Sequence, residues 1–280
     1  MHAYENLFLG RPFVELADIE SDWQRPSFDL AEQSIGLFDD AALIAYAEVS
    51  GRRAEAYVHP DRRGEGIGTA LAVWTEHLAR RDRGPDDAHE RLVGQSLPVA
   101  DREGIRLLAG RGYTRRHTSW ALRLPPEVEL PAVVLPPGVL VRSARAGVED
   151  RTVWTVIEDA FNEWPGREPS SFDDWAASVL RRPGFERWQL LVAAEGEAVV
   201  GACFVLVTGE EAWVQHLAVN RDRRGLGLGL ALLFEAARVS REHGAQVLEL
   251  STDSRTGALG LYEHVGMVVT DTFEHWALSA

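Results

Sequence analysis

The sequence predicts a duplicated domain of the mixed α/β class, in which each copy forms a mixed sheet with helices on its faces. Three observations indicate this. A glycine-rich segment occurs twice, at residues 63–68 and 224–229, the second half shows strands and helices in mixed order, and prolines gather between the halves at residues 125–137. A repeated segment indicates a duplicated structural unit, and mixed strands and helices indicate a sheet covered by helices.

The repeat extends well beyond the glycines. Segment 58–71 recurs as 219–232, segment 107–113 matches 261–267, and each half closes on Trp-Ala-Leu, at 120–122 and at 276–278. Three matches in the same order identify two copies of one domain. The prolines between them exclude helix and central strand and favour a semi-rigid extended linker. We therefore expect a first domain at 1–124, the linker at 125–137 and a second domain at 138–280.

Hydrophobic periodicity predicts the elements of the second half. Strands are expected at residues 140–143, 188–194, 198–207, 213–219 and 247–251, with a last strand that ends at 278, and helices at 151–162, 230–243 and 258–263. The first half follows the same order from residue 34. Its beginning is shorter, so we expect it to lack an opening strand and helix.

The composition limits the classes of partner and compartment. The formal net charge is −14, and all of the basic residues are arginine. Such a charge argues against nucleic acid and acidic membrane surfaces and favours a cationic substrate. The longest apolar run, residues 198–207, is about half of the ~20 residues that a membrane-spanning helix needs, and the first residues lack the features of a signal peptide. We therefore expect a cytoplasmic protein.

The chain has one cysteine, Cys203, which excludes an internal disulfide framework. It lies inside an apolar, strand-like run, which is typical of a small buried core residue rather than of a reactive thiol. We also expect no metal cofactor.

The glycine-rich loop at residues 224–229 follows a predicted strand and opens a predicted helix. Glycines let backbone N–H groups converge on an anion, and a helix N-terminus adds partial positive charge. A pyrophosphate is the natural occupant, although such glycines also serve as plain tight turns. A dinucleotide-binding fold is disfavoured, because these glycines follow a third strand and not a first one.

With these motifs the sequence resembles the GNAT superfamily of acyl-CoA-dependent N-acyltransferases. The signature Gln/Arg-x-x-Gly-x-Gly/Ala is met twice, by Arg224, Gly227 and Gly229 and by Arg63, Gly66 and Gly68. The tandem arrangement and residues 256–263 resemble actinobacterial tandem members, the mycothiol synthase group. The resemblance implies acetyl-CoA as co-substrate. It also implies that the loop with Arg224, Gly225, Gly227 and Gly229 holds the CoA pyrophosphate, and that the backbone of Leu217 and Val219 pairs with the pantetheine arm.

The resemblance assigns proton transfer to Tyr262, which matches the family's acid tyrosine, whereas the first half has Leu108 there. A phenol with a pKa of about 10 is protonated at neutral pH and able to donate to a departing thiolate. The base is less defined, because Gln215 stands where many relatives carry Glu. His216 is a candidate by its ordinary pKa, but neighbouring strand residues point to opposite faces. A water relay or a partly neutral amine is the alternative. Ser254 also departs from the family's Asn.

The resemblance implies that the segment between the first two strands of the second half forms the acceptor wall, and the candidates there are Glu163, Trp164, Asp174 and Trp175. Acids beside aromatic rings suit an ammonium group, although helix core and a helix N-terminus explain the same pattern. The sequence thus predicts acetylation of a primary amine of a small molecule by the second domain, with a degenerate first domain. A non-catalytic acyl-CoA-binding regulator and a protein N-terminal acetyltransferase are the alternatives, and a homodimer stays open.

Overall fold

The computed structural model describes residues 1–81, 92–164 and 167–279. The chain divides into two compact units: the first comprises residues 1–120, 253–257 and 271–280, and the second comprises residues 121–252 and 258–270. The units are therefore not the two consecutive halves that the repeat suggested. The end of the chain belongs to the first unit, because its last strand pairs with a strand of that unit.

Three short helices open the first unit, α1 (His2–Leu9), α2 (Leu16–Trp23) and α3 (Leu30–Gln33). As predicted, no strand precedes β1 within residues 1–33, all of which are described. The expected lack of an opening helix is wrong. The segment folds as helix because apolar residues such as Tyr4 and Phe8 are four positions apart and share one helix face.

The rest of the first unit is a sheet with helices. Its elements are β1 (Ser34–Asp39), β2 (Ala42–Ser50), β3 (Arg53–Val58), η1 (Pro60–Arg62), α4 (Ile67–Arg81), β4 (Leu92–Pro98), α5 (Arg102–Gly110) and β5 (Thr114–Leu124), which continues into the second unit. Strands β1 to β3 are antiparallel neighbours. The last strand of the chain, β11 (Val268–Ser279), pairs antiparallel with β4 from Phe273 onward. Leu71 of α4 packs on Ala45 and Ala47 of β2.

The second half of the chain contains every strand and helix that the periodicity predicted, in the same order, and adds α7, η2 and η3. The last of these strands, β11, belongs to the first unit from residue 271 onward, and the others lie in the second unit. Its elements are β6 (Val139–Ser143), α6 (Asp150–Phe161), α7 (Phe172–Ser178), η2 (Arg187–Gln189), β7 (Leu190–Glu195), β8 (Ala198–Thr208), β9 (Glu211–Val219), η3 (Arg221–Arg223), α8 (Leu228–Glu242), β10 (Val247–Asp253) and α9 (Leu259–His264).

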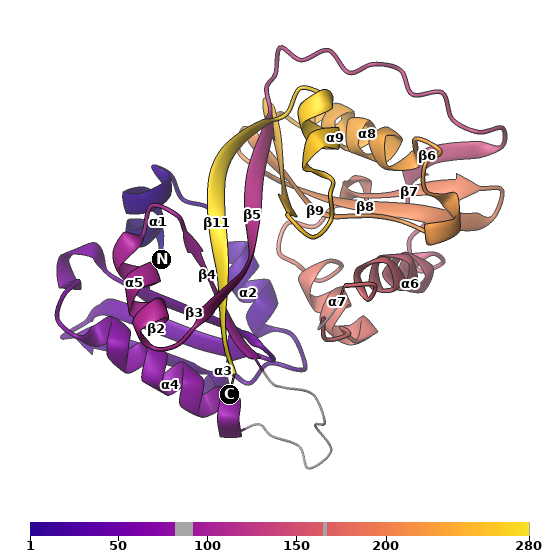
Figure 1. Cartoon of the computed structure of the whole chain (residues 1–280). Coiled ribbons are helices and arrows are strands. Elements are labelled where there is room, and N and C mark those ends of the chain that lie inside the picture. The colour runs from indigo at the N-terminus through magenta and orange to yellow at the C-terminus, as the bar shows by residue number, and fades with distance from the viewer. Residues whose placement is uncertain (82–91, 165–166, 280) are drawn as a thin grey trace. The chain divides into compact units, whose positions relative to one another are not determined.

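In the second unit β6, β7, β8 and β9 are successive antiparallel neighbours, and β10 pairs parallel with β9. Helices α6 and α7 cover one face of this sheet, and α8 and α9 cover the other (Figure 1). The core between the sheet and α6 contains Phe204, Ile157 and Trp175, each at most 3% exposed. Cys203 is fully buried, as predicted. None of the helices among the described residues has both the length and the apolar character needed to cross a bilayer.

Candidate active site

Strands β9 and β10 diverge at one end. Their pairing stops at Val214 and Leu250, although β9 continues to Val219 and β10 to Asp253. On the other side β9 stays paired with β8, and the N–H of Asn220 donates to the Val200 carbonyl at 3.0 Å. Because main-chain groups alternate along a strand, those of Leu217 and Val219 face away from β8, toward the divergence. This edge can pair with an extended ligand.

A β-bulge lies where the divergence begins. Phe204 of β8 faces His216, but the next residue, Val205, faces Val214. Gln215 is therefore an extra residue on β9. A bulge bends its strand and leaves the extra residue's main-chain groups outside the ladder. The bulge thus leaves main-chain groups of Gln215 free to meet a ligand at the place where β9 and β10 separate.

The glycine-rich loop leads from η3 into α8. Gly225 and Gly227 have φ angles of 77° and 80°, in the left-handed region that favours glycine. Gly227 is the N-cap of α8 and supplies no side-chain hydrogen bond. The first N–H groups of α8 are therefore without a helical partner and form a site suited to an anion. A Cβ at Gly225 would meet no atom within 4 Å, so the loop is open there, whereas one at Gly227 would lie 3.2 Å from Val133 of the linker.

The arginines of this loop differ in their engagement. Both terminal nitrogens of Arg224 donate to the Glu163 carboxylate, at 2.8 and 2.9 Å, and its Nε donates to the Val219 carbonyl at 3.1 Å. Arg223 pairs with Glu195 at 3.0 Å. For Arg221 there is no ion pair among the residues that the structure describes. Arg221 is therefore the loop cation most available to a phosphate.

Tyr262 lies on α9, in the part of the unit that follows β10. Its ring is half-buried, and burial, with a smaller effect of the Cys203 thiol, raises the pKa of Tyr262 to about 12. The hydroxyl is thus protonated at every pH at which the protein would work. In the first unit the matching Leu108 is 2% exposed and belongs to the hydrophobic core.

His216 lies on the opposite face of β9 from Leu217, between two aromatic rings. Phe161 meets it edge-on at 5.9 Å and Phe204 stacks on it at 6.2 Å. Its Nδ1 is buried and has no hydrogen-bond partner among the described residues. Burial, with a smaller contribution from Arg167, lowers the pKa of His216 to about 4, so the ring is neutral at physiological pH.

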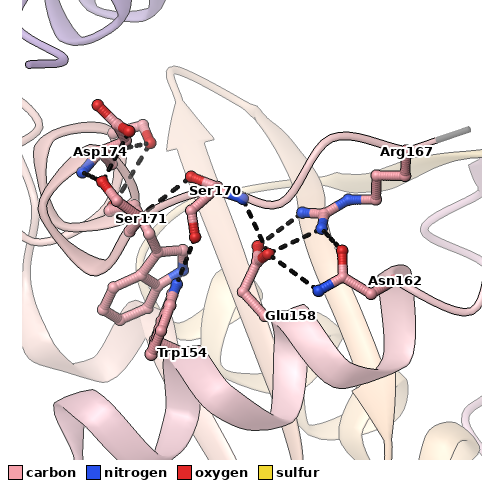
Figure 2. A network of polar contacts seen from close by, with 9 residues as sticks. Trp154, Glu158, Asn162, Arg167, Ser170, Ser171 and Asp174 are labelled. Carbon is pink, nitrogen blue, oxygen red and sulfur yellow. Dashed lines mark hydrogen bonds and ion pairs between the residues drawn. The ribbon is translucent and has the colours of Figure 1, made fainter. Parts of the chain in front are cut away.

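A polar network joins α6 to the segment that leads into α7 (Figure 2). The Glu158 carboxylate, on a residue that is 5% exposed, accepts from both terminal nitrogens of Arg167, at 2.8 and 2.6 Å, and from the N–H of Ser170 at 3.0 Å. The indole N–H of Trp154 donates to the Ser170 carbonyl at 3.2 Å. The network fixes this segment beside Phe161 and His216. Glu158 was not predicted from the sequence, although its place next to Ile157 in the apolar stripe of α6 indicates burial.

Comparisons with known proteins agree with this geometry. The acetyltransferase (GNAT) family model matches residues 151–267. A mycothiol acetyltransferase of Thermobispora bispora is 31% identical over 242 residues, which cover 81% of this chain and 77% of that protein. The chain belongs to the GNAT acetyltransferase family. It is an acyl-CoA-dependent acetyltransferase, as the resemblance predicted.

Solved structures support the same family and the tandem fold. The GCN5-related N-acetyltransferase from Sphaerobacter thermophilus aligns over 99% of this chain and 89% of its own, with a TM-score of 0.77 and 29% identity. A tandem GNAT protein from the clavulanic acid biosynthesis pathway aligns over 94% of this chain and 87% of its own, with a TM-score of 0.63. Its identity is 17%, so this likeness concerns the fold alone.

The residues of this GNAT chain fit the co-substrate that the family uses. The chain presents, in this order, an open strand edge, a glycine loop with free space in front of it and an uncapped helix N-terminus. No three His, Cys, Asp or Glu side chains in the described ranges are grouped to hold a metal ion.

The four residues predicted to bind the acceptor do not form one group. Asp174 is 7% exposed, and its carboxylate accepts from Ser171, the N-cap of α7, at 2.7 Å. Trp175 is 3% exposed within the core. For these two, the geometry favours the alternative interpretation of helix cap and core. Glu163 is exposed but paired with Arg224, and Trp164 packs edge-on against Phe161 at 4.8 Å.

Proposed function

We propose that the second unit transfers the acetyl group of acetyl-CoA to a primary amine of a small molecule. The observation that carries this proposal is the divergence of β9 from β10 beyond Val214, beside the uncapped N-terminus of α8. The main chain of Leu217 and Val219 would pair with the pantetheine arm. The loop from Arg224 to Gly229 and the first amides of α8 would hold the pyrophosphate.

The chemistry requires a neutral amine, a polarised thioester carbonyl and a stabilised thiolate. Main-chain groups freed by the bulge at Gln215 supply an N–H for the carbonyl oxygen as it gains negative charge. Tyr262 stabilises the sulfur of the departing CoA thiolate. Its pKa of about 12 exceeds the ~8.5 of an ordinary thiol, so its hydroxyl donates a hydrogen bond to the departing thiolate and water completes the protonation.

His216 has a limited role in this scheme. A ring with a pKa of about 4 is a poor base for an ammonium group, whose pKa lies several units higher. Its buried Nδ1 needs a donor, however, because an unsatisfied buried polar atom is costly. We propose that Nδ1 accepts a hydrogen bond from the acceptor nitrogen and orients it, while the ammonium proton leaves to water before attack.

The class of acceptor is suggested by the relatives. They are named mycothiol acetyltransferases, so acetyl transfer to a mycothiol-type amine is the first reaction to test. Phe161 and Trp164 would form the wall next to the amine, since aromatic faces attract cations while the amine is still charged. We place the reaction in the cytoplasm, where acetyl-CoA is made and used.

A non-catalytic acyl-CoA-binding role is the second candidate. The low pKa of His216 and the presence of Gln215 in place of an acid favour it, because neither residue is a strong base.

One assay separates the two functions. Free thiol release from acetyl-CoA is followed with a panel of amines, and CoA binding is measured by calorimetry on the same protein. Catalysis predicts thiol release that depends on an amine and falls in Tyr262→Phe. Binding of CoA without amine-dependent release from any member of the panel would instead support the regulatory role.

A further inference from the structure

The first unit has the same slot as the second. The repeat relates Val58 to Val219, and the same offset relates Arg53 to Val214. In the described residues β3 and β4 pair only at Arg53 and Gly94, although β3 continues to Val58 and β4 to Pro98. The central strand therefore leaves its parallel neighbour at the equivalent residue in both units.

Helix α1 spans this divergence. Tyr4 is 8% exposed, and its ring meets the ring of Tyr57, on β3, edge-on at 5.5 Å. Its hydroxyl donates at 2.9 Å to Asp101, which lies just beyond the end of β4. One side chain thus bridges the two strands where they separate. Glu5, also buried, accepts from the N–H groups of Phe13 and Val14 and fixes the chain that follows α1.

The arginine of the glycine loop in the first unit is also engaged by other residues of the protein. Arg63, the counterpart of Arg224, donates to Asp101 at 2.7 Å and to Glu103 at 3.3 Å, and its guanidinium lies 5.0 Å from the ring of Phe8 of α1. Asp101 is 2% exposed. Glu65 stands where the second loop has Leu226, two residues before α4 begins, and its carboxylate accepts from the Nε of Arg62 at 3.0 Å. A carboxylate at that place repels an anion.

We propose that α1 is the resident occupant of the first slot, in the place that an acyl-CoA arm takes in the second unit. This inference rests on the proposed function of the second slot. The chain then binds one equivalent of CoA, held by the second unit, and the first unit is closed by its own N-terminal helix.

The stoichiometry of CoA binding, measured by calorimetry and native mass spectrometry on the full chain, tests this. One equivalent is expected, and two equivalents overturn the proposal while leaving the proposed function intact. Leu226→Glu copies the first loop onto the exposed second loop and should abolish binding. Glu65→Leu is the matched control and should change the affinity less than twofold. A parent chain that binds two equivalents, one of which survives in Leu226→Glu, would show that the first slot is open, and the proposal would fail.

A second variant opens the first slot directly. In Tyr4→Ala/Phe8→Ala/Glu65→Leu the contacts of α1 with Tyr57, Asp101 and Arg63 are lost, and a gain of one CoA equivalent over the parent chain is expected. Circular dichroism and the Tm show whether the chain stays folded, and hydrogen exchange shows whether α1 has detached. A folded chain with a detached α1 and no added equivalent overturns the proposal. Absence of CoA binding in the parent with a gain in this variant would refute the proposed function alone.

Discussion

The two units share one fold, and they differ at only a few residues that could take part in catalysis. Both central strands leave their parallel neighbour at the equivalent residue. In the first unit, however, β2 and β3 pair without interruption, from Ala45 facing Val58 to Ser50 facing Arg53. In the second unit β9 carries the bulge at Gln215. The comparison shows that a duplicated domain can keep its fold and its slot although one copy lacks the bulge that frees main-chain groups in the other.

The exchange of Tyr262 for Leu108 has a physical rationale. Tyr262 is only half-buried, so its ring adds less apolar burial to the second unit than a core side chain does. Leu108, at 2% exposure, instead adds an apolar side chain to the core of its unit, worth roughly 1.5–3 kcal/mol. The first unit thus has a packed apolar side chain at the position where the second has a phenol.

Acid should destabilise both units through their buried histidines. The pKa values of His216 in the second unit and of His275 in the first are both lowered to about 4, chiefly by burial. Each depressed pKa contributes stability that is complete above pH 6.5 and is lost as the pH falls from 6.5 toward 4. The full loss is about 3 kcal/mol for each ring.

Replacing His216 by Phe should remove this loss from the second unit only, since Phe fits between Phe161 and Phe204. The Tm of His216→Phe, measured between pH 7 and 5, should fall less steeply than that of the parent. Parallel curves would show that the ring is already hydrated or paired in solution.

Tyr262→Phe tests the asymmetry of the proton donors. The ring packing is retained and only the hydroxyl is lost, so turnover should fall about 10²-fold with little change in Tm. Leu108→Met, a change of similar volume in the first unit, should leave turnover unaffected. Equal turnover of Tyr262→Phe and the parent would show that water alone serves the thiolate.

How far these features could be read from the sequence depends on how local they are. The elements of the second unit and the loop at Gly225 follow from periodicity and spacing, because each is set by neighbours in the chain. Tyr262 is singled out by the resemblance to the family. The bulge at Gln215 depends on the register with β8, and the pairing of β11 with β4 joins residues far apart in the sequence. Neither leaves a local pattern.

The residues predicted to bind the acceptor show the same limit. Trp164 and Trp175 both follow acidic residues and look alike in the sequence. Packing decides between them, since Trp175 enters the core below the sheet while Trp164 lies on Phe161. Burial of the acid at 158 likewise depends on Arg167 returning to it from beyond the end of α6.

Trp164→Ala should therefore raise the acceptor KM about tenfold and leave the acetyl-CoA KM unchanged, because a lost aromatic contact with a cation is worth about 1–2 kcal/mol. Trp175→Phe is the matched control within the same segment. It should lower the Tm and leave the ratio of the two KM values as in the parent. A selective acceptor effect in Trp175→Phe, and none in Trp164→Ala, would place the acceptor on the other side of α7.

The smallest expected effect concerns the arginine at the start of each signature loop, Arg63 in the first unit and Arg224 in the second. Arg63 is held by the buried Asp101, whereas Arg224 is held by Glu163, which is exposed and whose pKa Arg224 lowers. An exposed ion pair is weak and screened by salt. The pyrophosphate should therefore be able to replace Glu163 as the partner of Arg224. Glu163→Gln removes the competitor and should tighten CoA binding about two- to fivefold at low salt, less at high salt.

Calorimetric Kd values at two salt concentrations measure this effect, and the Tm should stay within about a degree, since little stability rests on an exposed pair. Asp101→Asn is the contrasting change in the first unit. It breaks a buried pair, so it should lower the Tm markedly and add no CoA equivalent while α1 is in place. Weaker CoA binding in Glu163→Gln would contradict this prediction. It would show that Glu163 holds Arg224 in its binding geometry and does not compete for it.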